Sequence, residues 1–308
     1  RSHFGSSISF REPIGTPMCS SESLELDEHA VAWGRSHLPH AFRRSKFSTE
    51  LLEFLQGLID EMSPEELRSI GFIEESQAIS SCPEAVGHHC RYARFHSVGS
   101  HAAPEGGDCS ERSSDRDEDP LQLPMPGALH KALHSFAVAF RRVNAVWLQE
   151  AVAGTPFEAA VARGAAFGAI TAQVHWGEAV RGPTLAWHTD TAASALHLAV
   201  TLRGDRTLHL IQASAPGRDL RTRALQQRSG DVYISMPCSF EHAVEFHRAD
   251  WEERSVAVMF RMSLLPQELE AVQNSDWSQV LRQIAERLAF APLAMPTIKQ
   301  VISEAQQN

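Results

Sequence analysis

The sequence lacks any long uninterrupted apolar segment. None approaches the roughly 18 residues that a membrane-spanning helix needs, although 43% of the 308 residues are hydrophobic. The first residues also lack the basic-then-apolar pattern of a secretory signal. We therefore expect a globular protein with no membrane insertion, soluble and intracellular, in the cytoplasm or the nucleus.

Cysteine and positive charge are both scarce. The five cysteines are odd in number and widely scattered, and a chain of this length buries enough core to fold without disulfides, which favours a reducing compartment. The 28 lysines and arginines against 38 aspartates and glutamates give a net charge of −10. Such a charge repels polyanions unless a local basic surface overrides it. Nucleic acid is therefore disfavoured as a partner.

Helical patterns dominate the first half of the chain. Residues 48–62 place leucines along one face behind Ser48, a favourable N-cap, and residues 126–153 show a longer pattern of the same period. Between them, residues 98–120 carry many charges and almost no large apolar side chains. Such a composition does not repay the entropy of ordering and predicts a mobile loop.

Short β-prone runs replace the helical pattern after residue 166. They are separated by turns rich in Gly, Pro, Asp and Arg, one of which, the RGD at 203–205, is expected to be a hairpin turn. This spacing predicts an antiparallel β core of the barrel or sandwich type, flanked by helices, and hence an α+β fold. The expected parts of this one domain are an N-terminal arm (1–47), a helical support region (48–165), a β core (166–263) and C-terminal helices (264–308).

A histidine and an aspartate lie two positions apart in "AWHTDTAAS" (186–194). In an extended segment this spacing places His188 and Asp190 on the same face of a sheet. His242 follows 52 residues after Asp190 in "SFEHAVEF", which leaves room for several strands before the chain returns. Two histidines and one carboxylate are the ligand set that holds non-haem Fe(II) and leaves coordination positions open.

The order of these motifs resembles the Fe(II)/2-oxoglutarate-dependent dioxygenases. The resemblance covers about residues 167–262: His188-x-Asp190, a Gly-Asp-Val before a strand (230–232), His242 in His-x-Val, and Arg254 twelve residues later. It implies a double-stranded β-helix, or jelly roll, with flanking helices, and a metal site made of His188, Asp190 and His242. It further implies Fe(II) as the metal and 2-oxoglutarate and O2 as cosubstrates, with release of succinate and CO2 as an organic substrate is hydroxylated or otherwise oxidised.

The same resemblance implies a cation that binds the distal carboxylate of 2-oxoglutarate. Arg254 is the expected anchor, because a guanidinium forms bidentate, charge-assisted pairs with carboxylates. Arg261 is the alternative, and the odd separation of seven residues places the two on opposite faces of a strand. Val256 stands where the family often has serine, and Ser255 is expected to face away. Tyr233 is a candidate for the missing hydroxyl, with a packing aromatic as the equal alternative.

The substrate is less well defined by the sequence. His175 and Trp176 precede the metal strand and are candidates to line the substrate entrance. Arginines gather in 217–228, and Arg221 and Arg223 are candidates for binding an anionic substrate, against a solvated loop as the alternative. His197 and His209 alternate with leucines and are assigned only as strand residues. Cys82, His88, His89 and Cys90 could bind a metal, but they lack the repeated C-x-x-C spacing of a zinc site and stay unassigned.

Four other interpretations remain open at this point. Base-modifying dioxygenases of the AlkB and TET kind share the same motif order, but the net charge of −10 weighs against a nucleic-acid substrate. A non-catalytic jelly-roll sensor of metal or metabolite and a cupin-type metalloenzyme without 2-oxoglutarate are the second and third. The fourth is a buried His–Asp hydrogen bond with His242 unrelated to it.

Overall fold

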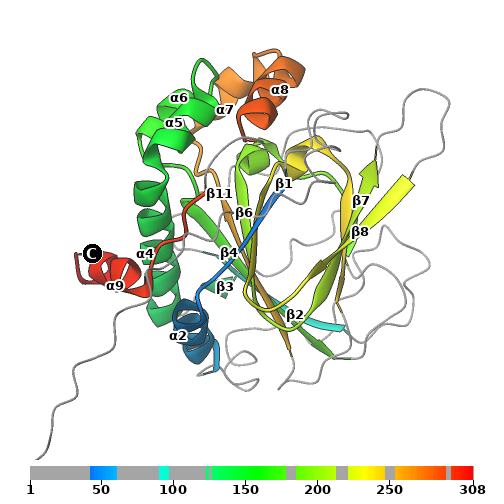
Figure 1. The fold of residues 1–308 in the computed structure, drawn as a ribbon. Coiled ribbons are helices and arrows are strands. Elements are labelled where there is room, and N and C mark those ends of the chain that lie inside the picture. Colours follow the sequence, from blue (N-terminus) through cyan, green and yellow to red (C-terminus); the bar gives the residue numbers. More distant parts are fainter. Residues whose placement is uncertain are drawn as a thin grey trace, which may run out of the picture.

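A computed structural model describes residues 42–60, 90–96, 123–124, 127–177, 185–212, 221–246, 254–288 and 293–307. Two sheets form its centre (Figure 1). The larger contains, in spatial order, β1 (Phe42–Lys46), β9 (Asp231–Ser235), β6 (His197–Arg203), β11 (Ser255–Arg261), β4 (Ala169–Gly177), β2 (Cys90–His96) and β3 (Leu123–Pro124). The smaller contains β5 (Leu185–His188), β10 (His242–Phe246), β7 (Arg206–Gln212) and β8 (Arg221–Gln227). Neighbouring strands are antiparallel except for β2 and β3.

The helices lie on the outer side of the larger sheet and at one end of the molecule (Figure 1). They are α2 (Thr49–Asp60), α4 (Gly127–Val143), α5 (Ala145–Val152), α6 (Glu158–Ala162), α7 (Pro266–Gln273), α8 (Trp277–Leu288) and α9 (Ile298–Gln307). Ser48 accepts a hydrogen bond from the Leu51 amide and so caps α2 as its sequence predicts (3.4 Å). The expected long helix over 126–153 is two helices, since the helical pattern breaks at Asn144, whose amide side chain bonds the Ala294 carbonyl.

Successive side chains of a strand point to opposite faces of the sheet, so the buried side chains form two separate hydrophobic clusters. On β11, Val256, Val258 and Phe260 pack against the helices, whereas Ala257 and Met259 belong to a second cluster between the sheets. The smaller sheet contributes Leu208, Leu210, Leu225 and Val244 to that second cluster. The two sheets therefore pack face to face around an interior of their own, and the protein has the expected α+β class, in an arrangement that fits a jelly roll.

Two connections differ from the sequence-based expectation. The RGD at 203–205 is not a hairpin turn, because β6 and β7 belong to different sheets and this turn carries the chain from one to the other. Residues 221–227, expected to lie in an arginine-rich loop, form β8 and pair with β7. The N-terminal and support regions also contribute strands, since β1 pairs with β9 and β2 pairs with β4.

Two of the regions singled out in the sequence lie outside the described residues. These are the 98–120 segment and most of the N-terminal arm. Within the described part of the chain, no helix combines the length and the apolar character needed to cross a membrane.

Candidate metal centre

The two histidines of the motif meet through strand pairing. His188 is the last residue of β5 and His242 the first of β10, and the antiparallel register places them directly opposite each other. Their rings lie 4.2 Å apart between centroids. Two histidines 54 positions apart in the sequence therefore form one cross-strand pair.

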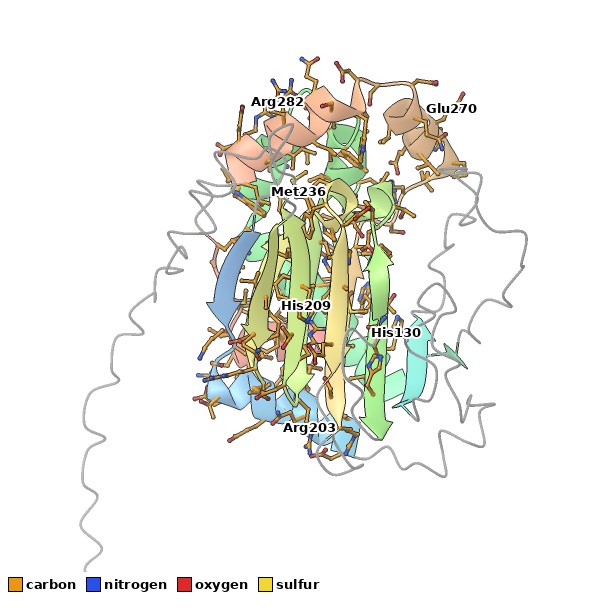
Figure 2. The ribbon with its side chains drawn as sticks, turned by 90° about the vertical axis from the view of Figure 1, so that its right-hand side faces the viewer. His130, Arg203, His209, Met236, Glu270 and Arg282 are labelled. Atoms are coloured by element: carbon orange, nitrogen blue, oxygen red, sulfur yellow. The ribbon has the colours of Figure 1, made fainter. Side chains whose placement is uncertain are left out.

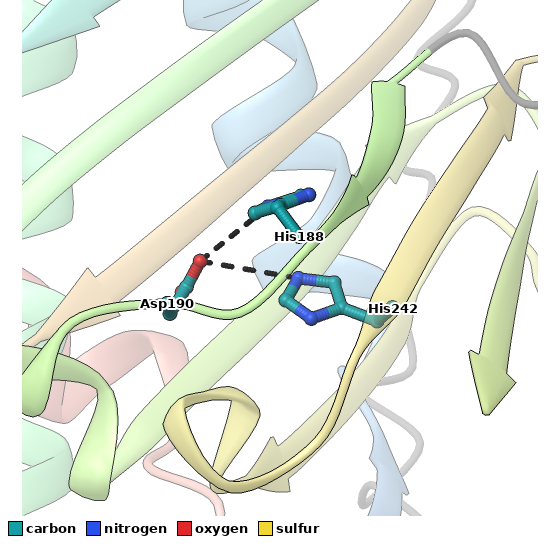
Figure 3. A group of neighbouring side chains, drawn as sticks. All are labelled: His188, Asp190 and His242. Atoms are coloured by element: carbon teal, nitrogen blue, oxygen red, sulfur yellow. Dashed lines mark ion pairs between the residues drawn. The ribbon is translucent and has the colours of Figure 1, made fainter. Parts of the chain in front are cut away.

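Asp190 completes the group from the turn after β5. The strand ends at His188, so the expected extended segment does not reach Asp190. Instead the Asp190 amide donates to the Pro237 carbonyl at 3.1 Å, which ties this turn to the 3-10 turn that precedes β10. Asp190 Oδ1 lies 3.5 Å from His188 Nε2 and 3.9 Å from His242 Nε2 (Figure 3). The three ligand atoms all lie within 4.8 Å of one another, a spacing at which they could hold one metal ion.

The two carboxylate oxygens of Asp190 have different surroundings. Oδ2 accepts hydrogen bonds from Ser194 Oγ at 2.7 Å and from Arg261 Nη2 at 3.2 Å, while Arg261 Nε donates to Ser194 Oγ at 3.0 Å. Burial alone would raise the pKa of Asp190, but Arg261, then His188 and His242, hold it well below the usual range. The carboxylate is therefore anionic, with Oδ2 fixed by the protein and Oδ1 turned toward the histidines.

The state of His242 suits a ligand as well. Its Nδ1 lies 3.5 Å from the Phe240 carbonyl oxygen, an acceptor that favours the proton on Nδ1 and leaves the Nε2 lone pair toward Asp190. Burial lowers the pKa of His242 to about 4, against the opposing effect of Asp190. His242 is 7% exposed, whereas the His188 side chain is 43% exposed. The candidate ligands are thus two imidazoles and one carboxylate, and solvent reaches them from the side of His188.

Arg254, the expected cosubstrate anchor, lies outside the interior between the sheets. Its guanidinium lies against α2 on the outer face of the larger sheet, where Nη2 donates to the Ile59 carbonyl and to Asp60 Oδ1, both at 3.2 Å. Arg261 lies on the opposite face and contacts Asp190, so the opposite orientation predicted from their spacing is confirmed. The inward position at the start of β11 belongs to Ser255, which shares the face of Ala257 and Met259 and was expected to face away.

The remaining candidates divide between the two ends of the interior. The triad end contains Asp190 and Met236, and the far end contains the turn after Arg203 (Figure 2). Tyr233 belongs to the interior cluster. His175, a candidate for the substrate entrance, pairs with Ser255 at the far end and so lies away from the triad. Trp176 continues β4 there, and its side chain lies outside the described residues, as do the side chains of Arg221 and Arg223.

Two interior residues were not recognised as part of the site from the sequence. His197 is 5% exposed, and within the described residues neither ring nitrogen has a hydrogen-bond partner. Burial first, then Arg261, lowers its pKa to about 3. Arg206 is 3% exposed and shares the interior face with Leu208 and Leu210. The alternation Arg-x-Leu-x-Leu over 206–210 could have predicted that Arg206 shares the buried face of the two leucines. Its position next to a turn made it look like a solvent-exposed residue.

Comparisons with known proteins are distant. No protein-family model and no curated protein matches the sequence. Among solved structures, the non-heme alpha-ketoglutarate-dependent epimerase SnoN from nogalamycin biosynthesis has a TM-score of 0.38 at 12% identity, over 78% of this chain and 87% of its own. The non-heme alpha-ketoglutarate-dependent carbocyclase SnoK from nogalamycin biosynthesis has a TM-score of 0.38 at 14% identity, over 80% of this chain and 87% of its own.

A third match is shorter. Drosophila melanogaster CENP-C, in a structure bound to CAL1, has a TM-score of 0.22 at 11% identity. That match covers 30% of this chain, and the chain spans 63% of that protein. Likenesses this weak carry no functional assignment, which depends here on the geometry of the site itself.

Proposed function

We propose that this protein is an Fe(II)- and 2-oxoglutarate-dependent oxygenase. The observation that carries the proposal is the His188–Asp190–His242 cluster, whose three ligand atoms gather at one end of an interior enclosed by two sheets. Two histidines and one carboxylate with open positions are the typical ligands of non-haem Fe(II) oxygenases.

The strand order supports the finer fold assignment. From β4 to β11, strands β4, β6, β9 and β11 lie in one sheet and β5, β7, β8 and β10 in the other. The chain therefore winds back and forth between two antiparallel four-stranded layers, which is the topology expected of a double-stranded β-helix. This fold would carry the triad on β5, on the turn after it, and on β10.

The residues of the chain have distinct tasks in this proposal. Iron would be held by Nε2 of His188, Nε2 of His242 and Oδ1 of Asp190, and it would supply activation of O2 coupled to conversion of 2-oxoglutarate to succinate and CO2. Arg261 and Ser194 bind Oδ2 of Asp190, which keeps that oxygen away from the metal. The Phe240 carbonyl orients the His242 ring. The exposed side of His188 is where a substrate would approach.

The substrate in this proposal is an organic anion. Arg223 pairs with Leu210, which pairs with His242, so the three stand in one row across the smaller sheet. Arg221 lies two residues before Arg223 on β8. One arginine in register with a candidate metal ligand and a second arginine on the same strand favour binding of carboxylate or phosphate groups. Arg223→Gln should weaken substrate turnover while leaving substrate-free succinate formation intact, and loss of both would contradict this role.

The decisive experiment separates binding from turnover. Anaerobic protein is titrated with Fe(II), then with 2-oxoglutarate, and the weak visible metal-to-ligand charge-transfer band is recorded; oxygen is then admitted and succinate is measured. Both the band and succinate are expected. A band without succinate would favour a non-catalytic sensor, and iron binding with neither would favour a cupin-type metalloenzyme.

A nucleic-acid substrate is a separate outcome of the same system. Affinity for DNA or RNA falls steeply and linearly with salt on logarithmic axes, because bound counterions are released. A small anion shows only a shallow dependence. The net charge of −10 makes the shallow dependence the expected result.

A further inference from the structure

Two histidines lie one helical turn apart on α4. His130 and His134 are separated by four residues, so their side chains stand on the same face of the helix. Their ring centroids are 6.2 Å apart, and the rings are tilted by 45° to each other. Two histidines at this spacing on one helical face can bind a transition metal together. The proposed function makes no use of either residue.

The hydrophobic core fixes the backbone that carries this pair. Leu129 and Leu133, the residues just before the two histidines, are each 1% exposed. Phe136 is fully buried and packs against Phe140 on the same helix and Phe260 of β11. The two histidines follow the edge of this buried stripe and are half-exposed. Binding an ion would therefore order only two side chains, on a helix whose position is already set.

Both imidazoles are available as ligands. Among the described residues, neither ring makes a hydrogen bond or an ion pair, whereas the half-exposed His209 is held by Glu245 at 2.9 Å. Burial lowers the pKa of His134, with smaller contributions from Arg141 and then His130. A metal binds the neutral form of imidazole, so a ring that is unprotonated at neutral pH binds an ion without first losing a proton.

The composition of α4 selects the kind of metal. The helix contains no aspartate or glutamate, and the next positions on the histidine face are Val138 and Arg141. The Arg141 guanidinium donates to the Ala166 carbonyl at 2.9 Å, and its positive charge means that attraction must come from coordination bonds. Imidazole nitrogens suit Cu(II), Ni(II) and Zn(II), whereas Mg(II) and Ca(II) need oxygen ligands.

The pair and the triad lie on opposite sides of the larger sheet (Figure 1). α4 packs on the outer side, through the contact of Phe136 with Phe260. Ala257 and Met259 of the same strand face the interior between the sheets, at one end of which the triad lies. An ion on α4 would therefore be separated from a metal at the triad by the thickness of the sheet. The two sites also differ in their ligands, because only the triad includes a carboxylate.

We propose that His130 and His134 chelate one divalent transition-metal ion, with Cu(II) bound more tightly than Ni(II) or Zn(II), and with water in the remaining positions. Each ring supplies one nitrogen at about 2.1 Å from the ion, and rotation about the side-chain bonds brings the two rings to that distance. The bound ion cross-links two turns of α4 and stabilises the folded protein. This site is independent of the proposed function, since it requires neither iron nor 2-oxoglutarate.

The test uses Ni(II) as the probe in a chain whose triad is disabled by His188→Ala and Asp190→Ala. Calorimetric titration of this parent chain should show one tight equivalent of Ni(II). His134→Gln should weaken that binding by about 100-fold, because the second nitrogen is lost together with the effective concentration that the helix gives it. Lys131→Gln, an exposed change between the two histidines, is the matched control and should bind Ni(II) as the parent does. Binding by other histidines is common to all these chains and cancels in the comparison.

Combining the substitutions distinguishes one chelate from two separate histidines. If the rings hold one ion together, His130→Gln and His134→Gln should each abolish the tight equivalent, and the combined variant should lose no more of it, a non-additive result. Urea unfolding without metal should be the same in all these chains, since both rings are half-exposed and unpaired among the described residues, and Ni(II) should raise the midpoint of the parent alone. Affinity within about threefold of the parent in either single variant, or losses that add in the combined one, would overturn the proposal. An equal rise in midpoint in the combined variant would also overturn it, because the ion would then bind elsewhere.

Discussion

The two ends of the interior treat buried charge in opposite ways. At the triad end the Asp190 carboxylate is matched by the Arg261 guanidinium and by Ser194, and one oxygen is left facing two neutral imidazoles. At the far end the Arg206 guanidinium lies across from the uncharged Gln227 amide, and its Nη2 has no hydrogen-bond partner among the described residues. The first arrangement suits a cation and the second an anion. A molecule with a chelating end and a carboxylate end would satisfy both at once.

Arg254 and Arg206 sharpen this contrast. Both are 3% exposed and both lie near the Gly204 turn. Arg254 donates to a carbonyl and a carboxylate of α2 and thereby ties that helix to the sheet, whereas Arg206 faces the interior with an unpaired nitrogen among the described residues. Burial of an arginine therefore does not identify a binding residue; what distinguishes one is a donor that the fold leaves unused.

The largest expected effect is at the carboxylate of the triad. Asp190→Ala removes the anionic ligand and leaves two imidazoles beside the Arg261 guanidinium, so Fe(II) affinity should fall by more than about 100-fold, beyond the loss expected from an outer partner. Anaerobic metal titration measures it. Asp205→Ala, which changes an exposed aspartate at the far end, should bind iron as the wild type does. Unchanged iron binding in Asp190→Ala would show that the triad is a hydrogen-bonded core group.

A smaller effect is expected at the arginine behind that carboxylate. Arg261→Met keeps the length of the side chain but frees Oδ2 of Asp190, so the carboxylate is no longer held in one orientation. Metal affinity should fall by about 10- to 100-fold, the range typical for groups that orient a ligand. 2-Oxopentanoate has the same five-carbon chain as 2-oxoglutarate but ends in a methyl group, and the ratio of the affinities for the two keto acids should stay at its wild-type value. A change in that ratio with unaltered metal affinity would instead make Arg261 the cosubstrate anchor.

The grouping of His188, Asp190 and His242 could be predicted in part from the sequence because the first two lie close together in the chain. His188 and Asp190 lie within one short segment, and the strand pattern after residue 166 required the chain to return near them. The strand pairing of His188 and His242 was not visible, but it needed only that two β-prone runs become neighbours. Residue type, short spacing and strand content were sufficient for this part of the site.

The sequence could not predict which of the two arginines faces the interior, for a physical reason. Alternation fixes which residues of β11 share a face, but it does not say which face is the interior. Both faces of this central strand are apolar, with Val256, Val258 and Phe260 on one and Ala257 and Met259 on the other. The pattern therefore separated Arg254 from Arg261 without orienting either. The helix that binds Arg254 lies about 195 residues earlier in the chain, beyond any local signal.

The smallest effect, and the finest probe of the interior, is the acid dependence of stability in the metal-free protein. The pKa of His197 is lowered from 6.5 to about 3, by burial and then by Arg261, so the unfolded chain binds a proton that the folded protein excludes. The corresponding stability is present above pH 6.5 and is lost as the pH falls toward 3, by up to about 1.4 kcal/mol for each pH unit. His242, with a pKa of about 4, adds to the loss over a narrower window. Urea unfolding at pH values from 7 to 4.5 should show this decline, and His197→Phe, which cannot titrate, should make it less steep. An equal slope in the variant would mean that water reaches His197 in solution. The lowered pKa of His197 would then not describe the folded protein.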